Sequence, residues 1–338
     1  MKIAIDCMGS DKGPEVMVKG AVKGAKKHKD SELVLVGNES EIQEILNGLE
    51  IDNLTITIHN TTQVIKNDDK PIVAVRAKKD SSMVVASRMV SANDVDAFIT
   101  AGSTGAYLTA GLLIIGRIKG IRRPALSAII PSYIINNKEA LLIDCGANMD
   151  ATSDDLYNYA IMGEIYSREL MGRKHPRISL LNVGLEEGKG NKLVKETYEI
   201  LKESDLNFIG NIEARTVFNG ETDVVVCDGF SGNVAIKTFE GAAKALMGKL
   251  KEAIMSGFKS KIGALLLKSN LEAMKEDLDY NQYGGGVLLG LKGVAVKCHG
   301  SASELAVEVA FTQTYNMVKK NLVETIEEKL REKFNEEN

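Results

Sequence analysis

A glycine-containing stretch, VDAFITAGSTGAYLTAG at residues 95–111, holds residue types that could bind an anion. Its apolar start predicts a strand, and a helix is expected to begin near Thr104. Gly102 and Gly105 would let the backbone turn sharply and approach a ligand closely, and the first N–H groups of a helix have no partner within that helix. Such donors suit a phosphate or another oxyanion. Ser103 and Thr104 add hydroxyl groups, although an N-cap role alone would also explain one of them.

Small and polar residues follow five other predicted strands. The stretches are MKIAIDCMGSDKG (1–13), LLIDCGANMD (141–150), SLLNVGLEEGKG (179–190), DVVVCDGFSGN (223–233) and GVAVKCHGSAS (293–303). In an open α/β sheet, such strand ends line one crevice, where ligands bind. The chain contains neither the Gly-Lys-Ser/Thr phosphate loop nor the G-x-G-x-x-G nucleotide motif, so the crevice is not expected to be a nucleotide site of either kind.

The composition is that of an ordinary globular protein: 338 residues, 44% hydrophobic and 26% charged. A net charge of −4 provides no basic field for nucleic acid, which is therefore not an expected partner. The four cysteines lack C-x-x-C spacing and there are only four histidines, so we expect no metal site and no acyl-cysteine. The chain enters a strand directly, without a signal peptide, which favours a cytoplasmic location.

The elements that must position these residues alternate between strand and helix. The expected strands are 1–6, 33–36, 54–59, 95–99, 125–130, 140–143, 177–182, 207–211, 223–227 and 294–297. The expected helices are 14–28, 39–47, 71–89, a helix from 104, 153–171, 192–202 and 303–333. This pattern predicts a three-layer α/β/α fold with a mostly parallel sheet, and an antiparallel hairpin around a turn at 136–137 makes the sheet mixed. We expect one domain over residues 1–338, with a helical excursion inserted at about 233–279.

Several motifs carry a resemblance to a known family. DCMGSDKGP at 6–14 is similar to the D-A-M-G-G-D-x-x-P motif of the bacterial phosphate acyltransferases. The other matching stretches are KPIVAVRAKKDSSMVVA (70–86), TAGSTGA (100–106), DCGAN (144–148), LLNVGLEEGKGN (180–191), FIGNIEAR (208–215), VVVCDGFSGNVAIK (224–237) and VAVKCHGSAS (294–303). The chain departs from the family pattern at Cys7, Ser10, Ser103 and Ala214, where the family usually has Ala, Gly, Asn and Gly. A role for an asparagine amide at position 103 therefore cannot be carried over.

The resemblance implies a function, a fold and partners. The family moves a fatty acyl group from acyl carrier protein to inorganic phosphate for phospholipid synthesis, without a cofactor and usually as a homodimer. Its fold is similar to those of the isocitrate and isopropylmalate dehydrogenases and of phosphotransacetylase. Two alternatives stay open: a phosphotransacetylase-like transfer from acyl-coenzyme A, and a non-catalytic module that binds acyl carrier protein or membranes.

If phosphate is the acceptor, it already carries a nucleophilic oxygen, so positioning and charge stabilisation should dominate catalysis. We expect phosphate against the loop 102–105 and near Lys189, with Lys297 as the second choice. His299 is the candidate proton donor to the leaving thiol, although a lone strand-end histidine is more often structural. The remaining candidates are amides that could hold substrate oxygens and carboxylates that could orient them: Asn148, Asn191, Asn211, Asn233, Asp144 and Asp228.

An amphipathic stretch lies within the helical excursion. Apolar residues recur every four positions from Leu250 to Leu266, and five lysines flank them with one glutamate, Glu252, between. This basic, apolar pattern predicts contact with a membrane surface, where a membrane acyltransferase could receive the product. The predicted membrane-contact residues are Phe258, Ile262, Leu265 and Leu266. Packing in the core or in a dimer interface is the alternative.

Overall fold

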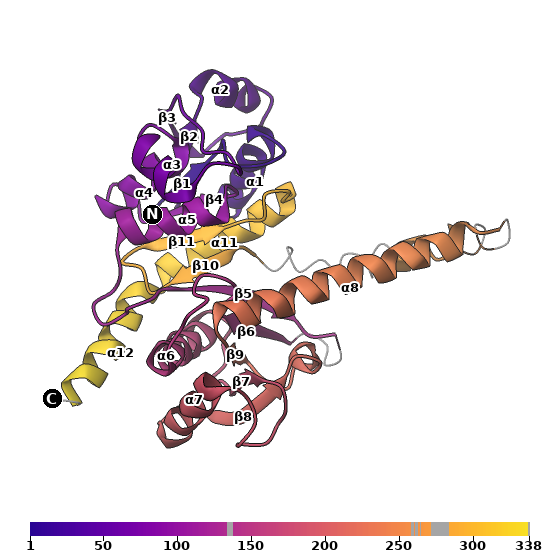
Figure 1. Cartoon of the computed structure of the whole chain (residues 1–338). Coiled ribbons are helices and arrows are strands. Elements are labelled where there is room, and N and C mark those ends of the chain that lie inside the picture. Colours follow the sequence, from indigo (N-terminus) through magenta and orange to yellow (C-terminus); the bar gives the residue numbers. More distant parts are fainter. Residues whose placement is uncertain (134–137, 258–259, 261–262, 264, 272–283, 337–338) are drawn as a thin grey trace.

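The computed structural model describes residues 1–133, 138–257, 260, 263, 265–271 and 284–336. Its centre is an eleven-stranded sheet with the order β3-β2-β1-β4-β11-β10-β5-β6-β9-β7-β8 (Figure 1). The strands are β1 Lys2–Asp6, β2 Glu32–Gly37, β3 Thr55–Asn60, β4 Ala97–Thr100, β5 Ala125–Pro131, β6 Glu139–Ile143, β7 Ile178–Asn182, β8 Phe208–Glu213, β9 Val224–Val226, β10 Gly286–Leu289 and β11 Val294–Lys297. Only the pairings of β5 with β6, β5 with β10 and β10 with β11 are antiparallel among the described strands, which confirms the predicted mixed, mostly parallel sheet.

Helices cover both faces of this sheet. They are α1 Pro14–Lys27, α2 Glu39–Asn47, α3 Pro71–Ala77, α4 Ser82–Ser91, α5 Thr104–Ala110, α6 Ser153–Leu170, α7 Lys192–Glu203, α8 Gly229–Met255, α11 Glu304–Lys319 and α12 Leu322–Glu336, with a π-helical turn at Gly111–Ile115 and a 3-10 turn at Val217–Asn219. Side chains alternate along β1, so Ile3 and Ile5 join the core cluster under α1 and α11, whereas Ala4 joins the cluster under α4 and α5. The predicted three layers follow from this alternation.

The structure corrects three element boundaries. The helix expected at 71–89 is two helices, α3 and α4, because the chain turns at 78–81, where the Lys78 ammonium bonds the Val64 carbonyl and the Asp69 carboxylate. The final helix is also divided, because Asn321 adopts a left-handed φ of 49°. Strand β10 was not predicted, since its four residues begin with the last of three consecutive glycines and lack a strand-like pattern. The predicted turn at 136–137 lies outside the described residues.

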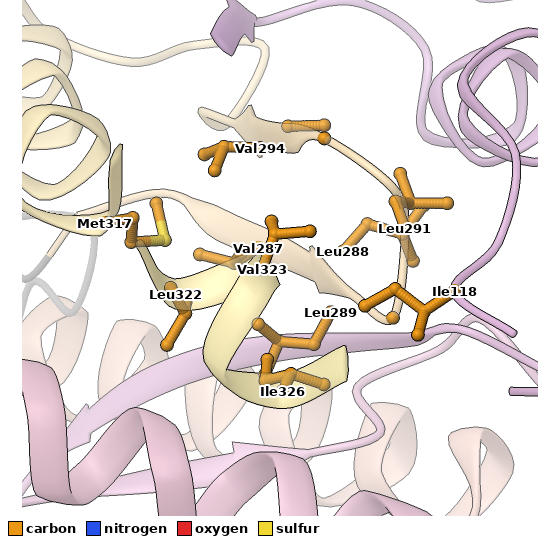
Figure 2. Close-up of a pocket in the computed structure, with 13 residues that line it drawn as sticks. Ile118, Val287, Leu288, Leu289, Leu291, Val294, Met317, Leu322, Val323 and Ile326 are labelled. Carbon is orange, nitrogen blue, oxygen red and sulfur yellow. The ribbon is translucent and has the colours of Figure 1, made fainter. Parts of the chain in front are cut away.

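The C-terminal helices close the core over β10 and β11. Figure 2 shows Leu322, Val323 and Ile326 with Met317, pointing toward Val287 and Leu289 of β10. The cavity left between them measures about 10 Å³, which is space for no more than one water molecule. This region is therefore packed core, and the candidate site lies elsewhere.

Helix α8 is the long projecting element of the molecule (Figure 1). It begins directly after β9, where the Asp228 carboxylate accepts hydrogen bonds from the backbone N–H groups of Phe230 and Ser231, both at 3.0 Å. This N-cap fixes the start of the helix at Gly229, four residues before the predicted excursion. The first turns of α8 lie over the sheet and the rest extends away from it.

Candidate active site

A cleft of about 170 Å³ lies between the first turns of α8 and the ends of β4 and β11. β4 and β11 run parallel with Thr100 opposite Lys297, so the loops that follow the two strands leave the sheet side by side. The cleft therefore brings together four of the predicted site residues: Thr104, Asn233, Lys297 and His299. Leu126, Ala128, Ile129 and Ile236 form an apolar floor beside them.

Lys297 is the half-buried cation of this cleft. Its ammonium donates a hydrogen bond to the Cys298 carbonyl at 3.0 Å, and it forms no ion pair within the described part of the chain. Burial lowers the pKa of Lys297; Cys298 and the Asp11 carboxylate partly oppose this shift, and the Lys237 ammonium adds a smaller lowering effect. A bound anion would supply the missing negative charge, so Lys297 is well placed to hold phosphate.

His299 presents a hydrogen-bond donor beside Lys297. Its Nδ1 accepts the backbone N–H of Ser301 at 3.2 Å and lies 2.8 Å from the Ser301 hydroxyl. Because a backbone N–H can only donate, Nδ1 is an acceptor, and in the neutral ring the hydrogen is on Nε2. This geometry fixes the ring and leaves Nε2 as a donor for a substrate oxygen or sulfur.

The glycines of the loop 102–105 have a packing role that the sequence did not reveal. The Gly102 N–H donates to the Thr100 hydroxyl at 2.9 Å, so it is not free to bind phosphate. A Cβ at Gly102 would lie 2.5 Å from the Met83 methyl group, and one at Gly105 would lie 2.6 Å from Pro71 Cγ. Both glycines are therefore required for close packing on α3 and α4, and their close approach to a ligand stays a prediction.

The other half of the loop retains ligand-binding capacity. Ser103 is the N-cap of α5, but its side chain makes no capping hydrogen bond. Thr104 begins the helix and lines the cleft. Thr104 can thus act together with Lys297 and His299, whereas Ser103 is not among the residues that line the cleft.

Three predicted residues hold loops instead. The Asp144 carboxylate accepts the backbone N–H groups of Gly146, Ala147 and Asn148 at 2.8–3.0 Å. The Asn148 amide donates to the Pro124 carbonyl, to Asp144 and to the Tyr159 hydroxyl, which uses its amide hydrogens. Asp228 caps α8. The structure gives these residues a supporting role for the loop after β6 and for the start of α8.

Lys189, Asn191 and Asn211 lie in a second region, around the loop between β7 and α7. Asn191 caps α7 by accepting the Val194 N–H at 2.9 Å, and the Asn211 amide donates to the Glu186 carbonyl. The exposed Lys189 ammonium lies 3.9 Å from the Glu186 carboxylate. β10, β5, β6 and β9 separate β11 from β7, and five spacings of about 4.8 Å amount to roughly 24 Å. Lys189 and Lys297 therefore lie far apart within one subunit.

Beside this second region is a larger, mostly apolar groove of about 800 Å³. Val183 and Val194 form one wall, and Phe230, Val234 and Phe239 of α8 form the other. The groove and the polar cleft lie on opposite sides of α8, because the helix presents Asn233, Ile236 and Lys237 to one and Phe230, Val234 and Thr238 to the other.

Two cleft residues were missed from the sequence, Lys237 and Glu240 of α8, whose side chains form an ion pair at 2.9 Å. The spacing contained a signal, because Lys237 lies one helical turn after Asn233 and therefore on the same face. This ion pair offsets the Lys237 charge, whereas Lys297 has no such partner among the described residues.

The cysteines are poor nucleophiles here. Cys145 lines the cleft, but burial raises its pKa well above the ordinary thiol value, and the same holds for Cys7 and Cys227. Among the described residues, no group of three or more His, Cys, Asp or Glu side chains is arranged to hold a metal ion. Nor does any described helix combine the length and apolar character needed to span a bilayer.

The chain is similar to known proteins over nearly its whole length. The family model described as "Fatty acid synthesis protein" matches residues 1–325. The chain is 47% identical over 338 residues to a phosphate acyltransferase of Clostridioides difficile, with 100% of this chain and 98% of the relative covered. It is 47% identical over 326 residues to a phosphate acyltransferase of Bacillus thuringiensis, with 96% and 97% covered.

Solved structures share the fold. A phosphotransacetylase from Streptococcus pyogenes matches with a TM-score of 0.61 at 17% identity, covering 95% of this chain and 94% of that one. A branched-chain phosphotransacylase from Enterococcus faecalis matches with a TM-score of 0.57 at 15% identity, covering 94% and 99%. These matches confirm the predicted likeness to phosphotransacetylase. The chain belongs to the fatty acid synthesis protein family, in which its curated relatives are phosphate acyltransferases, and it is an acyltransferase that catalyses phosphate acyl transfer.

Proposed function

We propose that this enzyme transfers a fatty acyl group from acyl carrier protein to inorganic phosphate, giving an acyl phosphate for phospholipid synthesis. The observation that carries the proposal is the half-buried Lys297 ammonium, without an ion pair among the described residues, at the polar end of a cleft with an apolar floor. Phosphate fits the polar end, and the first carbons of an acyl chain fit over Leu126 and Ile236.

The mechanism needs no protein nucleophile. Phosphate held by Lys297 and the Thr104 hydroxyl attacks the thioester carbonyl, and a new C–O bond forms. The oxyanion that develops receives hydrogen bonds from the Asn233 amide or from His299 Nε2. The C–S bond then breaks and the sulfur leaves as a thiolate or takes a proton from the solvent side. Most of the rate acceleration comes from positioning and charge stabilisation.

One assay tests this function against its alternatives. The protein is incubated with phosphate and either palmitoyl-acyl carrier protein or palmitoyl-coenzyme A, and acyl phosphate is trapped as hydroxamate. We expect hydroxamate from the carrier protein thioester. Consumption of the coenzyme A thioester alone would favour the phosphotransacetylase-like reaction, and consumption of neither would favour a non-catalytic binding module.

Direct transfer has its own test. Cys145→Ala and Cys7→Ala should each keep most of the activity, because burial keeps both thiols protonated. The measurement is hydroxamate formation under saturating substrate. Mass-spectrometric capture of an acyl group on any cysteine would show a covalent intermediate and refute direct attack by phosphate.

The far end of the helical excursion is proposed to contact the membrane. Leu265 and Leu266 are 73% and 79% exposed, while Phe258 and Ile262 lie outside the described residues. Full burial of one exposed leucine in lipid contributes about 1.5–3 kcal/mol to the binding free energy. Two leucines would therefore give only weak and reversible attachment. Leu265→Glu with Leu266→Glu should abolish flotation with anionic liposomes and leave soluble transacylation unchanged. The half-exposed Leu305→Glu is the matched control, and loss of flotation there too would refute a specific membrane contact.

The apolar groove beside α8 supports a homodimer. Phe230 and Val234 are at least half exposed at its edge, and exposed apolar surface of this kind is typical of subunit interfaces. Phe230→Glu with Val234→Glu should reduce the mass measured by light scattering from dimer to monomer. A wild-type protein that is already monomeric would remove this proposal.

A further inference from the structure

A short helix near the cleft exposes apolar side chains. Helix α3 is seven residues long and buries Ala74 and Val75 against the core. Its outer face carries Ile72 and Val73, which are 57% and 61% exposed. Adjacent aliphatic side chains on an outer helix face are the kind of surface that proteins use to bind a partner.

Basic side chains surround these two residues. Residues 66–80 carry five basic and three acidic side chains, a net charge of +2 in a chain whose total is −4. Lys78 is paired with Asp69, whereas the exposed Lys66, Lys70, Arg76 and Lys79 have no ion-pair partner in the part of the chain that the structure describes. The α3 face, defined here as Ile72 and Val73 with these four cations, is therefore positive on an acidic protein.

The α3 face also adjoins the cleft. Pro71, at the start of α3, packs directly on Gly105, the neighbour of the cleft residue Thr104. On the other side, the Asn67 amide donates to the Asp11 carboxylate at 2.9 Å, and the Asp11 N–H donates to the carbonyl of Gly300, which follows His299. A molecule bound on α3 would thus sit at the edge of the cleft formed by the loops after β4 and β11.

We propose that the α3 face is the docking surface for the acidic carrier protein that delivers the acyl thioester. The inference rests on the proposed function, which requires a carrier to hold its flexible arm in the cleft for the time of one transfer. Opposite charges steer such encounters and fix their orientation, and a small apolar centre supplies contact without making release slow. The face combines both features next to the reacting groups.

Two other occupants would suit parts of this surface. Anionic lipid would also attract the cations, but the apolar part of the α3 face consists of only Ile72 and Val73. It has none of the aromatic residues typical of membrane interfaces. A second copy of this chain has a net charge of only −4 over 338 residues, so it would attract the cations less strongly than a small, acidic partner would. Charge complementarity thus favours the carrier protein, and the other two occupants are distinguished by the experiment.

The experiment compares two variants, each of which reverses the charge of two basic residues on one face of the sheet. The docking variant is Lys70→Glu with Arg76→Glu. The matched control is Lys26→Glu with Lys29→Glu, at and beyond the end of α1. Both lysines are exposed, form no ion pair among the described residues and lie on the opposite side of the sheet. Both variants change the net charge equally. Rates are measured with palmitoyl-acyl carrier protein and with palmitoyl-pantetheine, each with phosphate, at low and high salt.

We expect the docking variant to raise KM for the carrier protein thioester at least tenfold and to lose most of its salt dependence. Its rate with the pantetheine thioester should stay within twofold of wild type. The control should match wild type with both donors. Val73→Ser should raise the same KM several-fold without a change in net charge, which separates an apolar contact from long-range steering.

Four results would overturn the inference. A docking variant with unchanged KM on an active enzyme would remove α3 from the docking surface, and equal losses with both donors would indicate an effect on catalysis or folding. Loss of phosphatidylglycerol vesicle binding with unchanged KM would identify a membrane surface, and a change in oligomeric mass a subunit contact. If wild type forms no hydroxamate from either donor, the proposed function itself fails, an outcome distinct from all of these.

Discussion

The loop after β11 and the loop after β7 differ in ways that their sequences do not show. Each region has a lysine at or beyond the end of a buried strand, Lys297 as the last residue of β11 and Lys189 in the loop after β7, and each lies in a motif that resembles the same family. Lys297 is half buried and has no ion-pair partner among the described residues, whereas Lys189 is exposed and lies near Glu186. A cation is available to a substrate when its surroundings leave its charge uncompensated, and a position at a strand end does not ensure this.

Removing the buried lysine should have the largest effect. A hydrogen bond to a charged group contributes about 1.5–3 kcal/mol, so Lys297→Ala should lower kcat/KM for phosphate by roughly 10–150-fold. The reason is that no other cation of the cleft is free of a carboxylate partner in the described structure. Phosphate titrations with hydroxamate detection measure the effect.

An unchanged phosphate dependence in Lys297→Ala would contradict the role of Lys297 as the phosphate-binding cation. A protein that remains folded but has normal phosphate kinetics would show that the anion binds elsewhere. Circular dichroism and melting temperature are the accompanying controls, since replacing a half-buried lysine also removes packing by its aliphatic stem.

Glycines also differ between the cleft side of the sheet, where Gly105 lies at the start of α5, and the loop after β7. Gly105→Val should destabilise the fold by about 1–3 kcal/mol, because its Cβ would lie 2.6 Å from the Pro71 ring. Gly188→Val in the loop after β7 is the matched control, since a Cβ there meets nothing within 4 Å. We expect that control within about 0.5 kcal/mol of wild type. Urea unfolding measures both, and equal stabilities would contradict the packing role of Gly105.

Much of the fold could be predicted from the chain alone. Alternating apolar runs and capped helices located α2 and β11 to the residue and most other elements within a few residues. The failures have two different causes. Asn321 ends α11 by a left-handed backbone that apolar periodicity does not reveal, and β10 gains its strand conformation from pairing with β5 and β11.

The sequence predicted which strand ends carry polar residues, but it did not predict how these residues are arranged in space. Local patterns give each strand but not the order of strands in the sheet, and that order places β11 beside β4 and β7 far from both. The hydrogen bonds of single side chains were equally hidden from the sequence. Asn148 and Asn233 both follow a strand, but among the described residues only the Asn148 amide donates to a loop carbonyl and a carboxylate. The roles of single polar residues depend on these contacts.

The buried environment of Lys297 also predicts a pH effect. Burial lowers its pKa below the ordinary lysine value of 10.5, so the ammonium is lost at a lower pH than that of an ordinary lysine. As pH rises through the lowered pKa, phosphate KM should increase. Over the same window, up to 10.5, the unfolded chain binds more protons than the folded one, so the free energy of unfolding should rise with pH.

Lys297→Arg is the control for this pH effect, because arginine stays protonated throughout the window. Its phosphate KM, whatever its value at pH 7, should change less with rising pH than that of wild type. Parallel curves for the two proteins would assign the titration to another group.

The smallest expected effect is that of Lys189→Ala. The sequence made Lys189 the first choice for phosphate, but its ammonium is exposed and screened by water, and its interaction with Glu186 at 3.9 Å is of the surface kind that contributes at most about 1 kcal/mol. We therefore expect phosphate KM within about twofold of wild type and an unchanged melting temperature. Because Asn191 and Gly190 of the same loop line the apolar groove, light scattering should accompany the kinetics. A large rise in phosphate KM with an intact oligomer would bring the loop after β7 into the active site, and the separation of the two regions along the sheet would then have to be bridged by a second subunit that places its Lys189 over the first subunit's cleft.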